Sequence, residues 1–388
     1  MIDRTITGKL LAMGSKFPIV TLTGPRQSGK STLLKSALPD YNYVSMEDPD
    51  SRLLAINDPR GFLKTYPDKT IIDEVQRVPD LFSYLQTHVD NENREGMYYL
   101  AGSQDFLLMP PISQSLAGRT AILKLLPFSH NELKLADLAP ETSNEEIFNG
   151  GYPRIYDKRI HPSDFYPNYI QTYIERDLRL LKNIDNLSKF IRFIKLCAGR
   201  IGQLLNLSSL ANEMGIAVST VQSWLSVLEA SYIVYLLVPD HNNYAKRLVK
   251  SPKLYFYDTG LACSLLEIEN ASQLSTHYLR GGLFENLVIN EFVKAALHDG
   301  QIPRLTFWRD STGNEVDLLV SVKGKQKAYE IKSGATFSSD HFKGIKVWAK
   351  LSETKPEDCC IIYSGDRALS TSHGEVIPWN ELSLAQFS

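Results

Sequence analysis

A glycine-rich segment near the N-terminus has the residue types and spacing of a phosphate-binding loop. The segment TLTGPRQSGKSTLL places two glycines, a lysine and a serine between a β-branched run and an amphipathic run. Glycines let backbone amides turn toward a phosphate, the lysine reaches the β- and γ-phosphates, and the serine hydroxyl can bind Mg²⁺. The alternative, a glycine turn followed by a chance lysine, weakens once the next motifs are included. We therefore predict a nucleoside triphosphate site formed by Gly24, Pro25, Arg26, Gln27, Ser28, Gly29, Lys30, Ser31 and Thr32.

Three polar side chains follow the next apolar runs of the chain. The run KTIIDEV ends in Asp73 and Glu74, and MYYLAGSQ places Ser103 after a third strand-like run. An aspartate at the end of a strand can hold Mg²⁺ through water, and a neighbouring glutamate can orient the attacking water. We predict that Asp73 and Ser31 hold the metal, that Glu74 acts as the base, and that Ser103 senses the γ-phosphate.

An arginine in the run SLAGRTAIL, Arg119, is a candidate for stabilising charge on the γ-phosphate. Such an arginine acts in cis or from a neighbouring subunit and can raise the rate by about 10³–10⁵. An ordinary surface arginine is an equally good interpretation. The role in trans requires assembly with copies of the same chain, and the sequence leaves both a monomer and a homo-oligomer open.

A second set of candidate metal-binding and catalytic residues lies in the C-terminal third of the chain. Asp317 lies in the strand-like run NEVDLLV, Glu330 and Lys332 share one face of the run AYEIKSG, and Glu285 lies in the amphipathic run GGLFENLVINEF. Two carboxylates about 4 Å apart repel by roughly 4 kcal/mol at an effective dielectric near 20, and a divalent cation removes that repulsion. We predict that Asp317 and Glu330 bind Mg²⁺ and that Lys332 steadies developing charge during phosphodiester cleavage. A structural ion cluster is the alternative.

These motifs together resemble the AAA-type P-loop ATPases of bacteria and archaea that carry a C-terminal domain of unknown function. The resemblance is carried by GPRQSGKSTL, IIDEVQ, YYLAGSQ and SLAGR, and later by GGYPRIY, YIERDLRLL, YFYDTGLA, GGLFENLVINEF and FWRDSTGNEVDLLV. It implies binding and hydrolysis of ATP with Mg²⁺. The order of a helix with Glu285, a strand with Asp317 and a strand with Glu330 and Lys332 is similar to the restriction-endonuclease, or PD-(D/E)xK, family. That similarity implies a nuclease-like domain and leaves open whether the domain cleaves.

The alternation of strand-like and helical runs in the first third predicts an α/β fold with a parallel sheet. The middle of the chain is expected to be helical and to contain a winged helix, and the C-terminal part is expected to be an α+β, restriction-endonuclease-like domain. The expected parts are a P-loop AAA-type ATPase core at 1–137, a helical lid or linker at 138–200, a winged helix at 201–262 and the nuclease-like domain at 263–388.

The winged-helix prediction comes from the segment between Leu207 and Leu237. Gly215 separates two helical runs, and the second run is expected to face inward with Val218, Val221, Leu225 and Leu228. No lysine or arginine occurs in this segment. Because phosphate neutralisation supplies most of the affinity for DNA, we expect a connector or protein-contact module rather than a DNA reader. A basic cluster in the presumed wing could still grip a DNA or RNA backbone, and it comprises Lys246, Arg247, Lys250 and Lys253.

The composition of the chain limits the classes of protein to which it can belong. The net charge of −2 does not draw the whole chain onto nucleic acid. The four cysteines have no CxxC spacing, and no apolar run approaches the roughly 18 residues typical of a membrane span. We therefore expect a cytoplasmic protein without a membrane segment.

Two interpretations of function follow from the sequence. The first is an ATP-driven module coupled to nucleic acid through the nuclease-like domain, where Trp308 and Arg309 could stack on or clamp a strand or could be core and surface residues. The second is a nucleotide-gated regulatory or scaffold ATPase whose nuclease-like domain is inactive and contacts a protein partner. A transcription regulator is a third class, which the absence of lysine and arginine from the second helical run of the winged helix disfavours.

Overall fold

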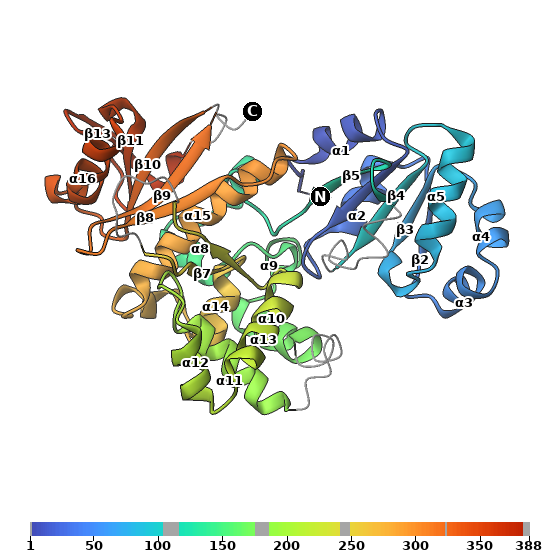
Figure 1. The fold of residues 1–388 in the computed structure, drawn as a ribbon, viewed down its shortest axis with the longest axis horizontal. Coiled ribbons are helices and arrows are strands. Elements are labelled where there is room, and N and C mark those ends of the chain that lie inside the picture. The colour runs from blue at the N-terminus through green and yellow to red at the C-terminus, as the bar shows by residue number, and fades with distance from the viewer. Residues whose placement is uncertain (1, 104–115, 175–185, 241–248, 323, 383–388) are drawn as a thin grey trace. The chain divides into compact units, whose positions relative to one another are not determined.

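The computed structural model describes residues 2–103, 116–174, 186–240, 249–322 and 324–382, and the chain divides into two compact units (Figure 1). The first unit comprises Met1–Phe128, Ala230–Tyr232 and Leu297–Gln301. The second unit comprises Ser129–Glu229, Ile233–Ala296 and Ile302–Ser388.

The first unit is built on a parallel five-stranded sheet in the order β2-β3-β4-β1-β5. Its strands are β1 (Ile19–Thr23), β2 (Asn42–Ser45), β3 (Thr70–Asp73), β4 (Tyr98–Gly102) and β5 (Thr120–Lys124). Its helices are α1 (Thr7–Gly14), α2 (Lys30–Ala37), α3 (Pro49–Asn57), α4 (Pro59–Thr65) and α5 (Leu81–Glu92). The predicted α/β fold with a parallel sheet is confirmed.

Alternate residues of the sheet pack into separate hydrophobic cores on its two faces. Ile72 and Leu100 pack in one core with residues of α4 and α5, including Phe62. Val20 and Leu22 pack in the other core with residues of α1 and α2. Strands that are buried on both faces carry near-continuous apolar runs, which is why the sequence shows little polar alternation in this part.

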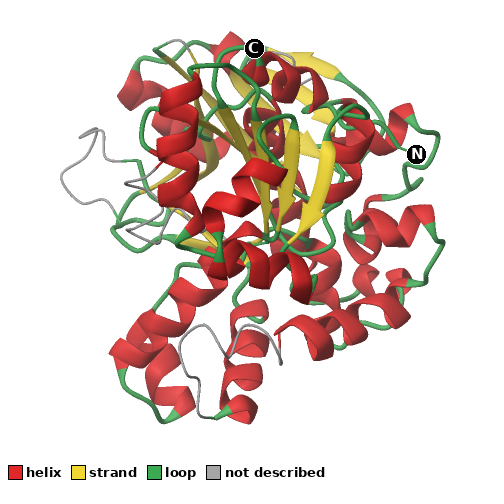
Figure 2. Ribbon diagram, turned by 90° about the vertical axis from the view of Figure 1, so that its right-hand side faces the viewer, coloured by secondary structure: helices red, strands yellow, loops and turns green. Residues whose placement is uncertain are grey.

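Helices make up most of the first half of the second unit. Figure 2 distinguishes the helices of the chain, in red, from its strands, in yellow. The helices of this half are α7 (His130–Leu135), α8 (Ser143–Asn149), α9 (Pro153–Asp157), α10 (Pro162–Tyr169), α11 (Leu187–Ala198), α12 (Leu207–Met214), α13 (Val218–Ala230) and α14 (Thr259–Leu265). A two-stranded antiparallel sheet of β6 (Val234–Leu237) and β7 (Lys253–Phe256) follows α13.

The turn between α12 and α13 lies at Gly215, as the sequence predicts, and this glycine has a left-handed φ of 62°. Val221, Leu225 and Leu228 are buried, but Val218 is 39% exposed, so its inward placement was wrong. Val218 is the first residue of α13 and lies beyond the packed part of the helix.

The second half of this unit contains a long helix and a mixed sheet. The helix is α15 (Arg280–His298), and the sheet has the order β12-β13-β11-β10-β9-β8. The elements are β8 (Leu305–Arg309), β9 (Glu315–Val322), β10 (Lys325–Lys332), α16 (Lys343–Ser352), β11 (Cys359–Tyr363), β12 (Leu369–Thr371) and β13 (Gly374–Pro378). β9 runs antiparallel to β8 and β10, whereas β10 and β11 are parallel. Trp308 is fully buried in the core of this sheet, so it is not available to stack on nucleic acid.

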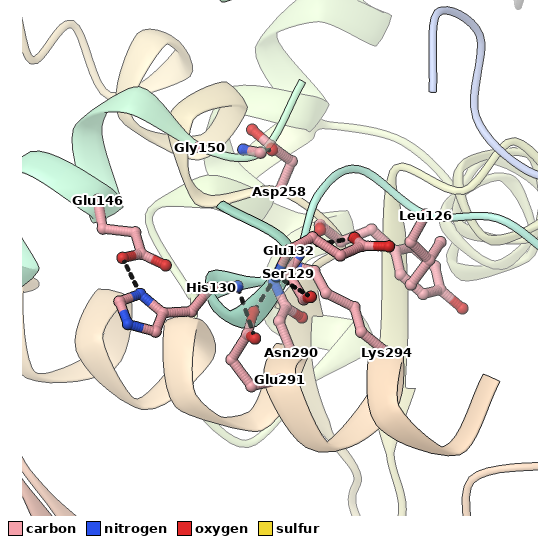
Figure 3. A network of polar contacts seen from close by, with 12 residues as sticks. Leu126, Ser129, His130, Glu132, Glu146, Gly150, Asp258, Asn290, Glu291 and Lys294 are labelled. Carbon is pink, nitrogen blue, oxygen red and sulfur yellow. Dashed lines mark hydrogen bonds and ion pairs between the residues drawn. The ribbon is translucent and has the colours of Figure 1, made fainter. Parts of the chain in front are cut away.

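A buried polar network ties α7 and α8 to α15 (Figure 3). The ring of His130 lies 2.7 Å from a carboxylate oxygen of Glu146, and its backbone N–H donates to Glu291 at 2.9 Å. Burial lowers the pKa of His130, but Glu146 outweighs burial and the net pKa is raised. The network therefore holds one face of α15 against the helical part of the unit.

Two of the sequence motifs meet at the buried carboxylate of Asp258. This side chain accepts hydrogen bonds from the backbone N–H of Gly151 at 2.8 Å, from Leu261 at 2.9 Å and from the Tyr166 hydroxyl at 2.7 Å. GGYPRIY supplies the glycine and YFYDTGLA supplies the aspartate. These contacts give the two motifs a structural role, because one buried acceptor satisfies three donors.

Candidate active sites

The loop between β1 and α2 has a backbone that only glycine adopts easily at two positions. Gly24 has a φ of 149°, and a Cβ there would lie 2.1 Å from the backbone oxygen of Leu125. Gly29 has a φ of 93° and immediately precedes Lys30, the first residue of α2. The amide groups at the start of α2 and the helix dipole favour an anion at this end of the helix. Pro25, Arg26, Gln27, Ser28 and Thr32 lie in the loop and the first turn of α2.

Lys30 is buried within this loop, at 5% exposure. Its ammonium group donates hydrogen bonds to the backbone oxygens of Gly24 at 2.9 Å and Pro25 at 2.7 Å. Burial lowers the pKa of Lys30 to about 8, although the negative charges of Glu74 and Asp73 act in the opposite direction. The loop therefore holds a partly desolvated cation whose charged form a phosphate would stabilise.

Asp73 joins three elements at the same edge of the sheet. Its Oδ2 atom accepts hydrogen bonds from the hydroxyls of Ser31 at 2.6 Å and Tyr43 at 2.7 Å, and its Oδ1 atom accepts from the N–H of Glu74 at 3.0 Å. Hydroxyl and carboxylate oxygens are the ligand types that Mg²⁺ takes, so Ser31 and Asp73 fit a magnesium ion. Tyr43 is absent from the sequence prediction, because no motif marks this β2 residue.

Glu74 and Ser103 meet where the parallel strands β3 and β4 end. The Ser103 hydroxyl donates to the Glu74 carboxylate at 3.1 Å, and the side-chain amide of Gln76 donates to the same oxygen at 2.5 Å. Glu74 has a left-handed backbone with a φ of 52°, which is uncommon for a residue with a side chain. Ser103 thus contacts the expected base. Gln76 lies within IIDEVQ but was not singled out.

Arg119 lies at the other end of the same sheet. Thr120 at the start of β5 pairs with Ile19 at the start of β1, whereas the loop follows the last residue of β1. The guanidinium group donates to the carboxylate of Asp90 at 2.6 and 2.8 Å. A role of Arg119 in cis on a phosphate bound at this loop was therefore wrong, and a role in trans stays a prediction.

The C-terminal carboxylates come together from three elements, and we call Glu285, Glu315, Asp317 and Glu330 the carboxylate cluster. Glu285 comes from α15, Asp317 from β9 and Glu330 from β10. Lys332 lies 2.6 Å from Glu330 and 3.8 Å from Asp317, and the backbone N–H of Ile331 donates to Asp317 at 2.8 Å. The structure thus gathers the four residues that the sequence singled out.

A further lysine, Lys253 of β7, is buried inside this cluster at 3% exposure. Its ammonium lies 2.8 Å from Glu285 and 3.8 Å from Asp317, and it also forms an ion pair with Glu315. The prediction that Lys253 belongs to an exposed basic wing was wrong, because β7 presents this side chain to α15 and β9. Lys246 and Arg247 lie outside the described residues, and Lys250 is exposed.

Burial and the neighbouring charges together shift the pKa values in the cluster. Burial raises the pKa of Glu285 to about 7 and the pKa of Glu330 to about 8, and the charge of Asp317 adds to both shifts. Burial lowers the pKa of Lys253, but Glu285 and Asp317 outweigh it and the net pKa is raised. The pKa of Lys332 is raised by its carboxylate neighbours in the same way, against the effect of burial.

The two carboxylates expected to hold Mg²⁺, Asp317 and Glu330, are already paired with ammonium groups. Both carboxylates face the ammonium of Lys332, and Asp317 also faces Lys253. Within the described ranges, no group of three or more His, Cys, Asp or Glu side chains is arranged to hold a metal ion. The ammonium groups of Lys332 and Lys253 already pair with these carboxylates, and Mg²⁺ at Asp317 and Glu330 stays a prediction.

No described helix combines the length and the apolar character needed to span a bilayer.

Family models match three successive parts of the chain. Residues 16–134 match an AAA domain, residues 140–272 match a domain of unknown function (DUF8612), and residues 280–382 match another (DUF4143). The uncharacterised proteins Rv2008c of Mycobacterium tuberculosis and Mb2031c of Mycobacterium bovis are each 31% identical to this chain over 324 residues. The match covers 82% of this chain and 71% of each mycobacterial protein.

Solved structures give weaker similarities. The Walker-type ATPase PABY2304 of Pyrococcus abyssi is 14% identical with a TM-score of 0.43, over 68% of this chain and 96% of that chain. AMPPCP-bound DnaA from Aquifex aeolicus is 13% identical with a TM-score of 0.29, over 58% of this chain and 85% of that chain. The sequence matches alone assign the family: this chain belongs with Rv2008c and Mb2031c, and its N-terminal part is an AAA-type P-loop ATPase domain.

Proposed function

We propose that this chain hydrolyses ATP with Mg²⁺ and uses its nucleotide state to control a nuclease-like C-terminal domain that does not itself cleave nucleic acid. The observation that carries the first half is the convergence of Lys30, the Ser31–Asp73 pair and Glu74 at one edge of the parallel sheet. This is the second of the two interpretations that the sequence leaves open, a regulatory or scaffold ATPase.

Each residue of the nucleotide site has a separate task in this proposal. Backbone amides of the Gly24–Gly29 loop and the ammonium of Lys30 hold the phosphates. Ser31 and Asp73 hold Mg²⁺, which when bound neutralises charge on the phosphate oxygens. Glu74 orients the attacking water and accepts its proton, and Ser103 and Gln76 fix the direction of the Glu74 carboxylate.

The C-terminal domain supports the second half of the proposal. Its helix α15, the antiparallel strands β8 to β10 and the placement of Glu285, Asp317, Glu330 and Lys332 favour a restriction-endonuclease-like fold. The α12–α13 pair and the β6–β7 sheet favour a winged helix in front of it. Cleavage by such a domain uses a divalent metal, and Lys253 makes the cluster a poor metal site. We therefore propose a protein partner rather than DNA or RNA.

We propose a role for Arg119 in ATP hydrolysis only where a second copy of the chain supplies the nucleotide site. The guanidinium of Arg119 is held by Asp90 at the far end of the sheet from the loop of the same chain. An arginine finger in trans would require a homo-oligomer in which this end of one ATPase unit faces the loop of the next.

A paired assay on one preparation tests the proposed function. The full chain with Mg²⁺ is expected to hydrolyse ATP and to leave single- and double-stranded DNA and RNA intact, with Mg²⁺ or Mn²⁺. Cleavage that disappears in Asp317→Ala and Lys332→Ala would replace this proposal with a metal-dependent nuclease. Absence of ATP hydrolysis would contradict its first half.

ATP binding near pH 8 is expected to take up protons. The pKa of Lys30 is lowered to about 8 by burial, so about half of these side chains are neutral at that pH before nucleotide binds. Phosphate charge favours the ammonium form and raises this pKa. Binding should therefore take up about half a proton per site near pH 8, and less near pH 7. Calorimetric titration with MgATP in two buffers of different ionisation enthalpy measures the uptake. A value near zero at pH 8 would show that Lys30 is already fully charged.

A further inference from the structure

We propose that the ammonium group of Lys253 is the built-in cation of the carboxylate cluster and takes the place that a divalent metal would otherwise occupy. The ammonium contacts Glu285 of α15 and both Glu315 and Asp317 of β9. One buried cation thus bridges carboxylates from two separate elements of the domain, as a metal ion would. The inference deepens the proposed function, because it gives the physical reason why the nuclease-like domain does not cleave.

The cluster is close to electrically balanced by side chains of the protein alone. Its four carboxylates, Glu285, Glu315, Asp317 and Glu330, are paired with Lys253, Lys332 and Arg309. A divalent ion added among these groups would lie within a few ångströms of one or two ammonium groups. Like charges at that distance repel, so the ion and the Lys253 ammonium exclude each other.

Hydrogen bonds between α15 and the backbone of β7 fix the position of Lys253. The side chain of Asn286 accepts from the N–H of Phe256 and donates to its carbonyl, both at 2.8 Å. Asn290, one turn further along α15, donates to the carbonyls of Phe256 and Tyr257 at 3.1 and 3.2 Å. Asn286 is the residue after Glu285, so the contact that holds the end of β7 against α15 also places Lys253 beside the Glu285 carboxylate.

The carboxylate cluster also contains one oxygen that forms no hydrogen bond with any described residue. Glu330 is 8% exposed, and its Oε2 atom is buried without a hydrogen-bond partner among the described residues. Its other oxygen binds Lys332 at 2.6 Å. Carboxylate oxygens without donors are the ligands a hard divalent cation takes. Removal of the Lys253 ammonium would leave Glu285, Glu315 and Asp317 without this cation, so that such an ion could bind in its place.

The test is a Mn²⁺ titration of the nucleotide-free full chain, with free Mn²⁺ followed by electron paramagnetic resonance. We expect Lys253→Met to bind one more Mn²⁺ per chain than wild type, at least about tenfold more tightly than any Mn²⁺ bound by wild type. Lys253→Arg, which keeps the cation, should behave as wild type. Adding Asp317→Asn to Lys253→Met should abolish the gain. An unchanged circular dichroism spectrum and thermal transition confirm that the variants are folded, and unchanged ATP hydrolysis separates this test from that of the ATPase.

Two results would overturn the proposal. One is a Mn²⁺ site in wild type that Asp317→Asn removes, because Lys253 and the metal would then coexist. This arm needs no lysine variant, so it stands even where Lys253→Met fails to fold. The other is a folded Lys253→Met chain that binds no more Mn²⁺ than wild type.

Discussion

Replacing Lys30 with alanine should abolish ATP hydrolysis and weaken ATP binding by about 100-fold or more. The ammonium of Lys30 is buried in the loop and donates to the carbonyls of Gly24 and Pro25, so it is already positioned beside the expected phosphates. A charge-assisted hydrogen bond to a phosphate contributes about 1.5–3 kcal/mol, and about 2.7 kcal/mol corresponds to 100-fold in affinity. Equilibrium binding of a fluorescent ATP analogue measures the change.

The matched control for Lys30 is Lys64, an exposed lysine in the last turn of α4 in the same unit. Lys64→Ala removes the same positive charge from the unit without touching the loop, so it should bind ATP as wild type does. If both alanine variants bound ATP with equal affinity, the loop would not be the nucleotide site.

Replacing Glu74 with glutamine should preserve ATP binding and slow hydrolysis by about 10²–10⁴-fold, the usual contribution of a positioned base. Ser103 and Gln76 both donate to one oxygen of Glu74, so the carboxylate is fixed in direction. Glutamine has nearly the same shape but does not accept the proton of the attacking water. Single-turnover hydrolysis of bound ATP, measured beside equilibrium binding, separates the two effects.

Glu47 provides the control for Glu74. It lies on the same unit, where Arg26 and Arg77 pair with it at 3.1 and 3.3 Å, and its side chain is half exposed. Glu47→Gln removes a carboxylate near the loop without removing the proposed base, and exposed ion pairs contribute little. Hydrolysis in Glu74→Gln at a rate within about twofold of Glu47→Gln would rule out Glu74 as the base.

The convergence of the predicted nucleotide-site residues could be expected from the sequence, because its signals are local. The spacing from Gly24 to Ser31 fixes the loop within one short segment, and Asp73 and Glu74 follow a short apolar strand. Parallel strands end at the same edge of a sheet, so the sequence pattern brings these parts together. Tyr43 was missed, because a hydroxyl that reaches Asp73 from a neighbouring strand leaves no pattern in its own segment.

The errors have a common physical origin in tertiary placement. Arg119 follows a glycine, as an arginine finger could, but the strand register puts it at the opposite end of β5 from the loop. The sequence predicts that Lys253 belongs to a basic wing with Lys250. In the structure Lys253 lies in β7, and its side chain points into the carboxylate cluster. In both cases the residue type is informative, and the direction of the side chain depends on elements distant in sequence.

The carboxylate cluster was predictable from the sequence only in part. The order of Glu285, Asp317, Glu330 and Lys332 along predicted elements was enough to expect that they would meet, and they do. Their chemistry was not predictable, because it depends on a lysine that arrives from a different part of the chain.

The central claim is that the loop between β1 and α2 holds a triphosphate through backbone amides, Lys30 and Mg²⁺. Isothermal titration calorimetry of the wild-type chain with ATP tests it most directly. We predict saturable binding at one site per chain in the presence of Mg²⁺, weakened when EDTA removes the metal. An absence of saturable binding with Mg²⁺ present would contradict the account.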